Sequence, residues 1–212
     1  MKKLKIGRIF VILILLSLFI LISAISYVDA VSNNIADSIF RLHVIANSDS
    51  KEDQELKLKV RDELLSYMNI ISKDSKSKQE AMQIANEHKE EFTQIAEKLI
   101  KENGYNYTVN VQIGKADFPT KYYGDITLPA GTYDALKVQI GEAKGQNWWC
   151  VMFPPLCFVD VSTGIVPDNS KQELKQSLDN EEYDLISKTD NNEISFKFKI
   201  VELFQNWRLG NK

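Results

Sequence analysis

The segment that most constrains this chain is its N-terminus, where a basic start leads into an apolar run that has no polar face. Apolar side chains extend from Ile9 to Ile22, interrupted only by Ser17, and four basic residues precede them: Lys2, Lys3, Lys5 and Arg8. A run that is apolar all round and flanked by charge is typical of a segment that enters lipid. Because positive charge stays on the inner side of a membrane, we expect the rest of the chain to lie outside the cytoplasm.

Two fates of this segment are open. Val28 and Ala30 are tolerated at the −3 and −1 positions of a signal-peptidase cut after Ala30, which is the outcome we favour. The stretch from Ile9 to Val28 is also close to the roughly 20 residues of a transmembrane helix, so it can stay as an uncleaved anchor. We therefore predict a signal peptide or membrane anchor over residues 1–30 and a single exported domain over residues 31–212.

The charge of the exported part limits its partners. Removing the four basic residues and Asp29 changes the formal net charge from −3 to −6. A domain with this charge repels a polyphosphate backbone, so a nucleic-acid partner is not expected. The sequence favours a protein or a small molecule instead.

Residues 39–104 predict a strand followed by two long helices. Residues 39–46 alternate apolar and polar side chains, with Arg41 and His43 on the polar side. Ser50 and Asp53 have the spacing of a capping box at a helix N-terminus. The first helix then has apolar residues at helical spacing: Leu56, Val60, Leu64, Leu65 and Met68.

The second helix is expected to begin after Ser77, which forms another capping-box pattern with Glu80, and to end at Gly104, a residue that favours a left-handed C-cap. One face of it carries Ala81, Ile84, Ala85, His88, Phe92, Ile95, Ala96 and Leu99. Alternation predicts further strands over residues 105–113, 122–128, 133–140 and 196–200, and a short helix over residues 171–178. We expect an α+β fold, a mostly antiparallel sheet packed with two long helices and preceded by an N-terminal signal or anchor helix.

The segment from Asn147 to Asp160 is unusual, because it holds two tryptophans, two cysteines and a Pro-Pro pair. In an exported protein, Cys150 and Cys157 can form a disulfide, and the prolines between them favour a turn. Two reduced, buried cysteines are an equally good interpretation, and a reactive thiol is a third. The sequence leaves these alternatives open.

Adjacent residues of a strand point to opposite faces of the sheet. One of Trp148 and Trp149 must therefore point away from the main core. It needs cover from the helices, from the membrane interface or from a partner, and tryptophan is enriched at binding hot spots.

Sites for catalysis are not convincing in this sequence. A thiol or serine enzyme needs a base near its nucleophile, and only His43 and His88 are available; His88 shares an apolar helix stripe and is expected to be a packing residue. Paired CxxC motifs, HExxH, G-x-S-x-G and a P-loop are absent from the sequence. We predict no catalytic residue, no metal site and no cofactor.

Two long blocks resemble the stage II sporulation protein R family. The first runs from Phe40 to Ser50 and on through residues 53–62; the second runs from Gly141 to Cys150 and on to residues 158–160. The resemblance implies a signalling protein of endospore-forming bacteria, exported from the forespore into the intermembrane space of the sporulation septum. There it would trigger a membrane-embedded aspartic protease that processes the sigma-E precursor.

The resemblance carries over no catalytic residue. It marks motif positions that are candidates for partner binding or for folding: Arg41, His43, Asn47, Ser48, Asp49, Trp148 and Trp149, with Cys150 and Cys157 as the candidate disulfide. A competing hypothesis is a cell-envelope thiol hydrolase that uses Cys150 and His43. A third is a structural component of the septum.

Overall fold

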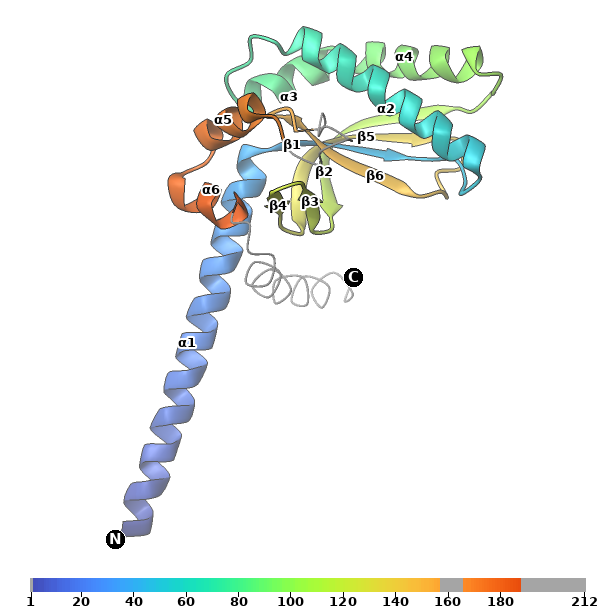
Figure 1. Ribbon diagram of the computed structural model, residues 1–212. Helices are drawn as coiled ribbons and strands as arrows, with labels where there is room; N and C mark the ends of the chain where they lie inside the picture. The colour runs from blue at the N-terminus through green and yellow to red at the C-terminus, as the bar shows by residue number, and fades with distance from the viewer. Residues whose placement is uncertain (1, 157–165, 188–212) are drawn as a thin grey trace.

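The computed structural model describes residues 2–156 and 166–187 (Figure 1). Its helices are α1 (Lys2–Ser38), α2 (Lys51–Ile71), α3 (Lys78–Glu87), α4 (Lys89–Glu102), α5 (Asp168–Ser177) and α6 (Asn180–Ser187). Its strands are β1 (Phe40–Ile45), β2 (Val109–Phe118), β3 (Lys121–Tyr123), β4 (Ile126–Leu128), β5 (Gly131–Ile140) and β6 (Asn147–Phe153). The fold is α+β, as the sequence predicts.

The main sheet has the strand order β2-β5-β1-β6. Strand β1 pairs parallel with β5 and antiparallel with β6, and β2 pairs antiparallel with β5. The sheet is therefore mostly antiparallel. Strands β3 and β4 form a separate two-stranded hairpin beneath it, on the side away from α2 and α4 (Figure 1).

Strand β1 is central in the sheet, and all six of its residues are buried. Phe40, Leu42 and Val44 face the helices, whereas Arg41 and His43 lie on the opposite face. The alternation predicted from the sequence is present, but its polar side is covered rather than open to water. The sheet face away from the helices is therefore distinguished by two buried basic residues, Arg41 and His43.

Helix α2 begins as its capping residues predict. The hydroxyl of Ser50 accepts a hydrogen bond of 3.2 Å from the backbone N–H of Asp53. All five apolar residues expected on its inner face are buried: Leu56, Val60, Leu64, Leu65 and Met68. The prediction of this helix is confirmed.

The second long helix of the prediction is wrong in one respect, because it is broken at His88 into α3 and α4. No glycine or proline marks the break. The His88 ring contacts Tyr67 on α2, as Phe92 of the same stripe does, and its Nδ1 forms a 2.8 Å hydrogen bond with the Tyr67 hydroxyl. The cap at Ser77 and the left-handed Gly104 after α4 are both as expected.

Two predicted strands also need correction. The strand expected from residue 105 begins at Val109, and Tyr105 and Tyr107 stack on each other before it. The strand expected over residues 122–128 is the β3–β4 hairpin, which turns at Gly124 with a φ of 58°. A strand expected over residues 196–200 lies outside the described residues.

Helix α1 is long and apolar enough to cross a membrane. No part of its most apolar stretch is buried against the rest of the described chain. Its last turns are different, because Ser32, Ile35 and Ala36 are buried against the domain. The backbone carbonyl of Ala36 accepts a hydrogen bond of 3.1 Å from Lys78 on α3. The N-terminal helix therefore fits a signal or anchor segment whose end is part of the core.

Candidate functional site

The turn between β1 and α2 is held by a polar cluster around Asp53. One carboxylate oxygen of Asp53 accepts hydrogen bonds from the Asn47 amide at 2.8 Å and from the Ser48 hydroxyl at 2.6 Å. Burial tends to raise the pKa of Asp53, but these hydrogen bonds, with others from Tyr107 and Ser50, outweigh it and hold the pKa below its usual value. Asn47 and Ser48 thus stabilise the turn.

The same turn binds the loop between β5 and β6. The Asn47 side-chain oxygen accepts from the backbone N–H of Glu142 at 3.0 Å, and Asp49 accepts from that of Gln146 at 2.7 Å. Lys57 of α2 is buried and donates to the Gln146 carbonyl at 3.1 Å. The two blocks that carry the family resemblance therefore meet in space.

Gly141 and Gly145 allow this close approach. Gly145 donates its backbone N–H to the Ala46 carbonyl at 3.0 Å, and a Cβ there would lie 2.1 Å from the carbonyl oxygen of Ser48. Gly141 has a φ of +56°, and a Cβ there would lie 2.2 Å from Asn47 Oδ1. Asn47, Ser48 and Asp49 consequently have a structural role in this junction.

Trp148 and Trp149 lie on opposite faces of β6, as their adjacency predicts. Trp148 is on the helix side, where the guanidinium carbon of Arg61 on α2 lies 4.1 Å from the centre of its ring. Trp149 is on the other side, stacked on His43 at a centroid distance of 5.7 Å, with the Lys121 ammonium 4.1 Å from its ring centre. Both rings are half-buried. Trp149 is the tryptophan that points away from the helices.

Cys150 and His43 do not form a catalytic pair in this fold. Cys150 is opposite Leu42 in the β1–β6 register, whereas His43 is opposite Trp149. Paired residues share a face and adjacent residues do not, so the thiol position and the imidazole are separated by the sheet. His43 instead bonds the side-chain oxygen of Asn147 through Nε2 at 2.7 Å.

The cysteine prediction is tested only in part. Cys150 is buried, and no free thiol occurs in the described part of the chain. Cys157 lies outside the described residues. The Cys150–Cys157 disulfide therefore stays a prediction.

Arg41 is fully buried in a cage of aromatic rings. Its guanidinium carbon lies 4.1 Å from the ring centre of Phe118 and 4.7 Å from that of Tyr133. Its Nη2 donates a hydrogen bond of 2.7 Å to the hydroxyl of Tyr123, while Nε and Nη1 have no partner. The cage stabilises the cation by cation–π contacts but satisfies only part of its donors.

Three further basic side chains surround Arg41 on this face, and we call Arg41, His43, Lys121 and Lys137 the basic cluster. His43 and Lys137 are opposite each other in the β1–β5 register. Burial lowers the pKa of His43; the bond to Asn147 opposes this, and the charges of Lys137 and Arg41 add to the lowering. Burial, with the charge of Arg41, also lowers the pKa of Lys121. The sequence identified Arg41 and His43 but missed Lys121 and Lys137, which no local pattern links to them.

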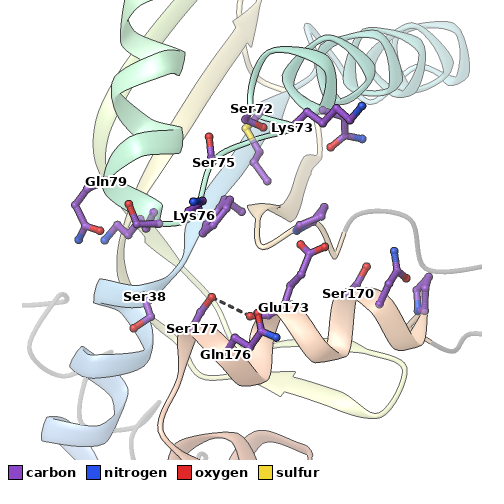
Figure 2. Close-up of a pocket in the computed structure, with 18 of the residues that line it drawn as sticks. Ser38, Ser72, Lys73, Ser75, Lys76, Gln79, Ser170, Glu173, Gln176 and Ser177 are labelled. Atoms are coloured by element: carbon purple, nitrogen blue, oxygen red, sulfur yellow. Dashed lines mark hydrogen bonds between the residues drawn. The ribbon is translucent and has the colours of Figure 1, made fainter.

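A separate polar pocket of about 950 Å³ lies where the end of α1 meets the α2–α3 connection and α5 (Figure 2). Its labelled side chains are mostly hydroxyls, amides and lysines, and Glu173 and Ser177 of α5 lie on one wall. Positive and negative groups are mixed in it, so it favours no charge class of ligand. Within residues 2–156 and 166–187, no group of histidine, cysteine and acidic residues is arranged to hold a metal ion.

Comparison with known proteins gives one consistent result. The family model described as stage II sporulation protein R matches residues 36–163. The protein named stage II sporulation protein R from Bacillus subtilis (strain 168) is 42% identical over 130 residues, which are 61% of this chain and 58% of the relative. The match thus spans less than two thirds of the relative's length. No solved structure matches the chain. The matched region covers the β1–α2 turn, the basic cluster and both tryptophans, and the chain belongs to the stage II sporulation protein R family.

Proposed function

We propose that this chain is an exported signal of sporulation, which triggers a membrane-embedded aspartic protease to process the sigma-E precursor. The observation that carries the proposal is the family match over residues 36–163, which includes the whole main sheet. The site of action would be the intermembrane space of the sporulation septum. The chain would act by binding and not by catalysis.

The N-terminal helix supports the export part of the proposal. It has the length and hydropathy of a signal or anchor, and its apolar side chains from Ile9 to Ile22 are exposed. The domain that follows begins folding contacts at Val31, next to the expected cut after Ala30. Cleavage there would leave the core contacts of Ile35 and Ala36 intact.

The sheet argues against the competing hypothesis of a thiol hydrolase. That reaction needs a base within hydrogen-bond reach of the nucleophile, and the register puts Cys150 and His43 on opposite faces. A conformational change of the strands themselves would be required to join them. Binding is the simpler activity for this domain.

Activation by binding follows from linkage. A domain that binds the active state of the protease more tightly than its inactive state shifts the population toward the active one by that difference in affinity. No chemistry is required of the domain. The requirement is a surface that distinguishes the two states.

Co-expression in a bacterium that does not sporulate tests the proposal. The full chain, the protease and the sigma-E precursor are expressed together, and processing of the precursor is followed by immunoblot. We expect processing with the full chain and none with a variant lacking residues 2–30, which stays inside the cell. If the precursor stays intact although the full chain is exported, or is processed equally without it, the proposed function is wrong.

A further inference from the structure

The feature that the proposed function does not explain is the buried charge of Arg41. A guanidinium that is completely removed from water loses its hydration, and this cost is usually offset by a carboxylate and by hydrogen bonds to all its donors. Among the described residues its acceptors are neutral: the hydroxyl of Tyr123 lies 2.7 Å from Nη2, and the hydroxyl of Tyr133 also interacts with the guanidinium. Two donor atoms, Nε and Nη1, are buried without a partner. No carboxylate of the described residues forms an ion pair with Arg41.

The surroundings of Arg41 add positive charge and no negative charge. None of the ion pairs among the described residues includes Arg41, His43, Lys121 or Lys137. Trp149, which stacks on His43, also has a buried indole N–H without an acceptor. In a chain with a formal charge of −3, four basic side chains without a carboxylate partner thus lie close together on this face of the sheet.

We propose that the basic cluster is the docking site for an acidic segment of the protein partner, with a carboxylate of that segment paired to Arg41. The inference rests on the proposed function for the identity of the partner, and it is carried by charge complementarity between this face and a carboxylate-rich segment. The aromatic rings hold the guanidinium in place, and its unpartnered Nε and Nη1 each have an N–H that can donate to a carboxylate. Trp149 at the rim supplies the aromatic contact typical of a binding hot spot.

The geometry favours a peptide over a membrane surface. Arg41 is enclosed by Phe118 and Tyr133 and has no exposed surface, so a flat bilayer cannot touch it, whereas a narrow group on a flexible chain can be inserted beside it. Lys121 and Lys137 are half-buried and lie nearer to solvent, so the acidic segment meets them first. For the carboxylate to reach Arg41, β3, which carries Lys121 and Tyr123, has to move aside.

Fluorescence anisotropy with a labelled hexaglutamate peptide tests the docking site. The full chain in micelles of an uncharged detergent is titrated against the peptide, with labelled hexaglutamine as the neutral probe. We expect hexaglutamate to bind, hexaglutamine not to bind, and added salt to weaken the binding. Hexaglutamate that does not bind, or hexaglutamine that binds equally well, would overturn the proposal.

A matched pair of double variants identifies the surface. Lys121→Met with Lys137→Met leaves the Arg41 cage in place, so folding is not at risk; the control is Lys51→Met with Lys98→Met, two exposed lysines of α2 and α4 that change the charge by the same amount. We expect at least about tenfold weaker hexaglutamate binding for the first pair and less than about twofold for the control. Equal loss in both pairs contradicts the docking site, as does a first pair that weakens binding to anionic phosphatidylglycerol vesicles but not binding to hexaglutamate.

The co-expression assay separates this inference from the proposed function. If the full chain triggers processing but the Lys121→Met, Lys137→Met variant triggers it equally well, the docking site is wrong and the function stands. If the wild-type chain triggers no processing, the function is wrong, whatever the peptide binding. Loss of both binding and triggering in the variant, with the control pair unaffected, supports both proposals.

Discussion

Arg41 on β1 and Tyr123 on β3 are joined by a hydrogen bond of 2.7 Å, although 82 residues separate them in the chain. The same Tyr123 hydroxyl donates to the backbone carbonyl of Trp149 at 3.1 Å. This one phenol therefore links the β3–β4 hairpin to two strands of the main sheet. It is also the acceptor of Nη2 of the buried guanidinium, whose Nε and Nη1 have no partner.

Removal of that hydroxyl is expected to destabilise the domain. Tyr123→Phe removes the 2.7 Å hydrogen bond of Arg41 Nη2, and loss of a buried acceptor costs about 1–3 kcal/mol. We expect a lower free energy of unfolding by that amount in urea titrations followed by circular dichroism. Tyr122→Phe, at the neighbouring exposed position of β3, is the control and should change little. Equal stabilities of the two variants would show that the bond contributes nothing.

The close approach at Gly145 gives a second prediction. In Gly145→Ala the new methyl group would overlap the Ser48 carbonyl oxygen, so either the β1–α2 turn or the β5–β6 loop must shift. Overpacking of this kind costs about 1–3 kcal/mol, measured as a lower thermal midpoint. Gly114→Ala on β2 is the matched control, since a Cβ there has no atom within 4 Å. A Gly145→Ala variant as stable as the control would contradict the described junction.

Asp53 predicts the pH dependence of stability. Burial raises its pKa, but the hydrogen bonds from Ser48, Asn47, Tyr107 and Ser50 lower it further, so the folded pKa lies below the unfolded value of about 4. A lowered folded pKa adds stability that is present above the unfolded pKa and is lost as the pH falls through the folded one. The stability advantage of wild type over Asp53→Asn should therefore be largest near neutral pH and shrink below about pH 4.

Urea titrations between pH 3 and 7 measure this difference. Ser48→Ala removes one of the hydrogen bonds that lower the pKa, at 2.6 Å from the carboxylate, so it should weaken the same pH dependence. An advantage that does not change with pH would mean that Asp53 is not stabilised in its charged form.

The state of the cysteines is tested by alkylation. Cys150 is buried, so the native chain should take up no iodoacetamide there. If the predicted disulfide with Cys157 forms, the chain unfolded in urea without reductant should also take up none, and two labels should appear only after reduction. Mass spectrometry counts the labels. Two labels in the unfolded, unreduced chain would establish reduced cysteines instead.

The end of α1 gives a fifth prediction. Ile35 is fully buried in the core, and Ile35→Ala should cost about 2–5 kcal/mol of unfolding free energy. Tyr27→Ala, in the exposed part of the same helix, is the control and should cost far less. Equal effects would mean that the helix end does not belong to the domain.

Local patterns in the sequence predicted the helices and strands that have a clear hydrophobic period and clear capping residues. Ser50 and Asp53 began a helix, Gly104 ended one, and adjacent tryptophans took opposite faces. The break at His88 was not predicted, because no glycine or proline marks it. Gly124 divides a stretch whose composition suited one strand.

The sequence predicted two residues of the candidate site but not how the site is arranged. Arg41 and His43 stood out in the sequence, yet their burial depends on Phe118 and Tyr133, which are distant in the chain. Lys121 and Lys137 join them only because β1 pairs with β5 and β3 folds beneath the sheet. Such contacts come from strand order, which no local period contains.

The continuity of α1 into the core limits how far an uncleaved signal can reach. If the membrane span runs from Ile9 to Val28, only two residues separate its end from Val31, where packing against the domain begins. At 1.5 Å per residue, this part of the helix is only about 5 Å long, so the domain would lie close to the bilayer surface. Such a domain could meet only partners near that surface. A cut after Ala30 would release the domain and let the signal diffuse to any receptor in the space.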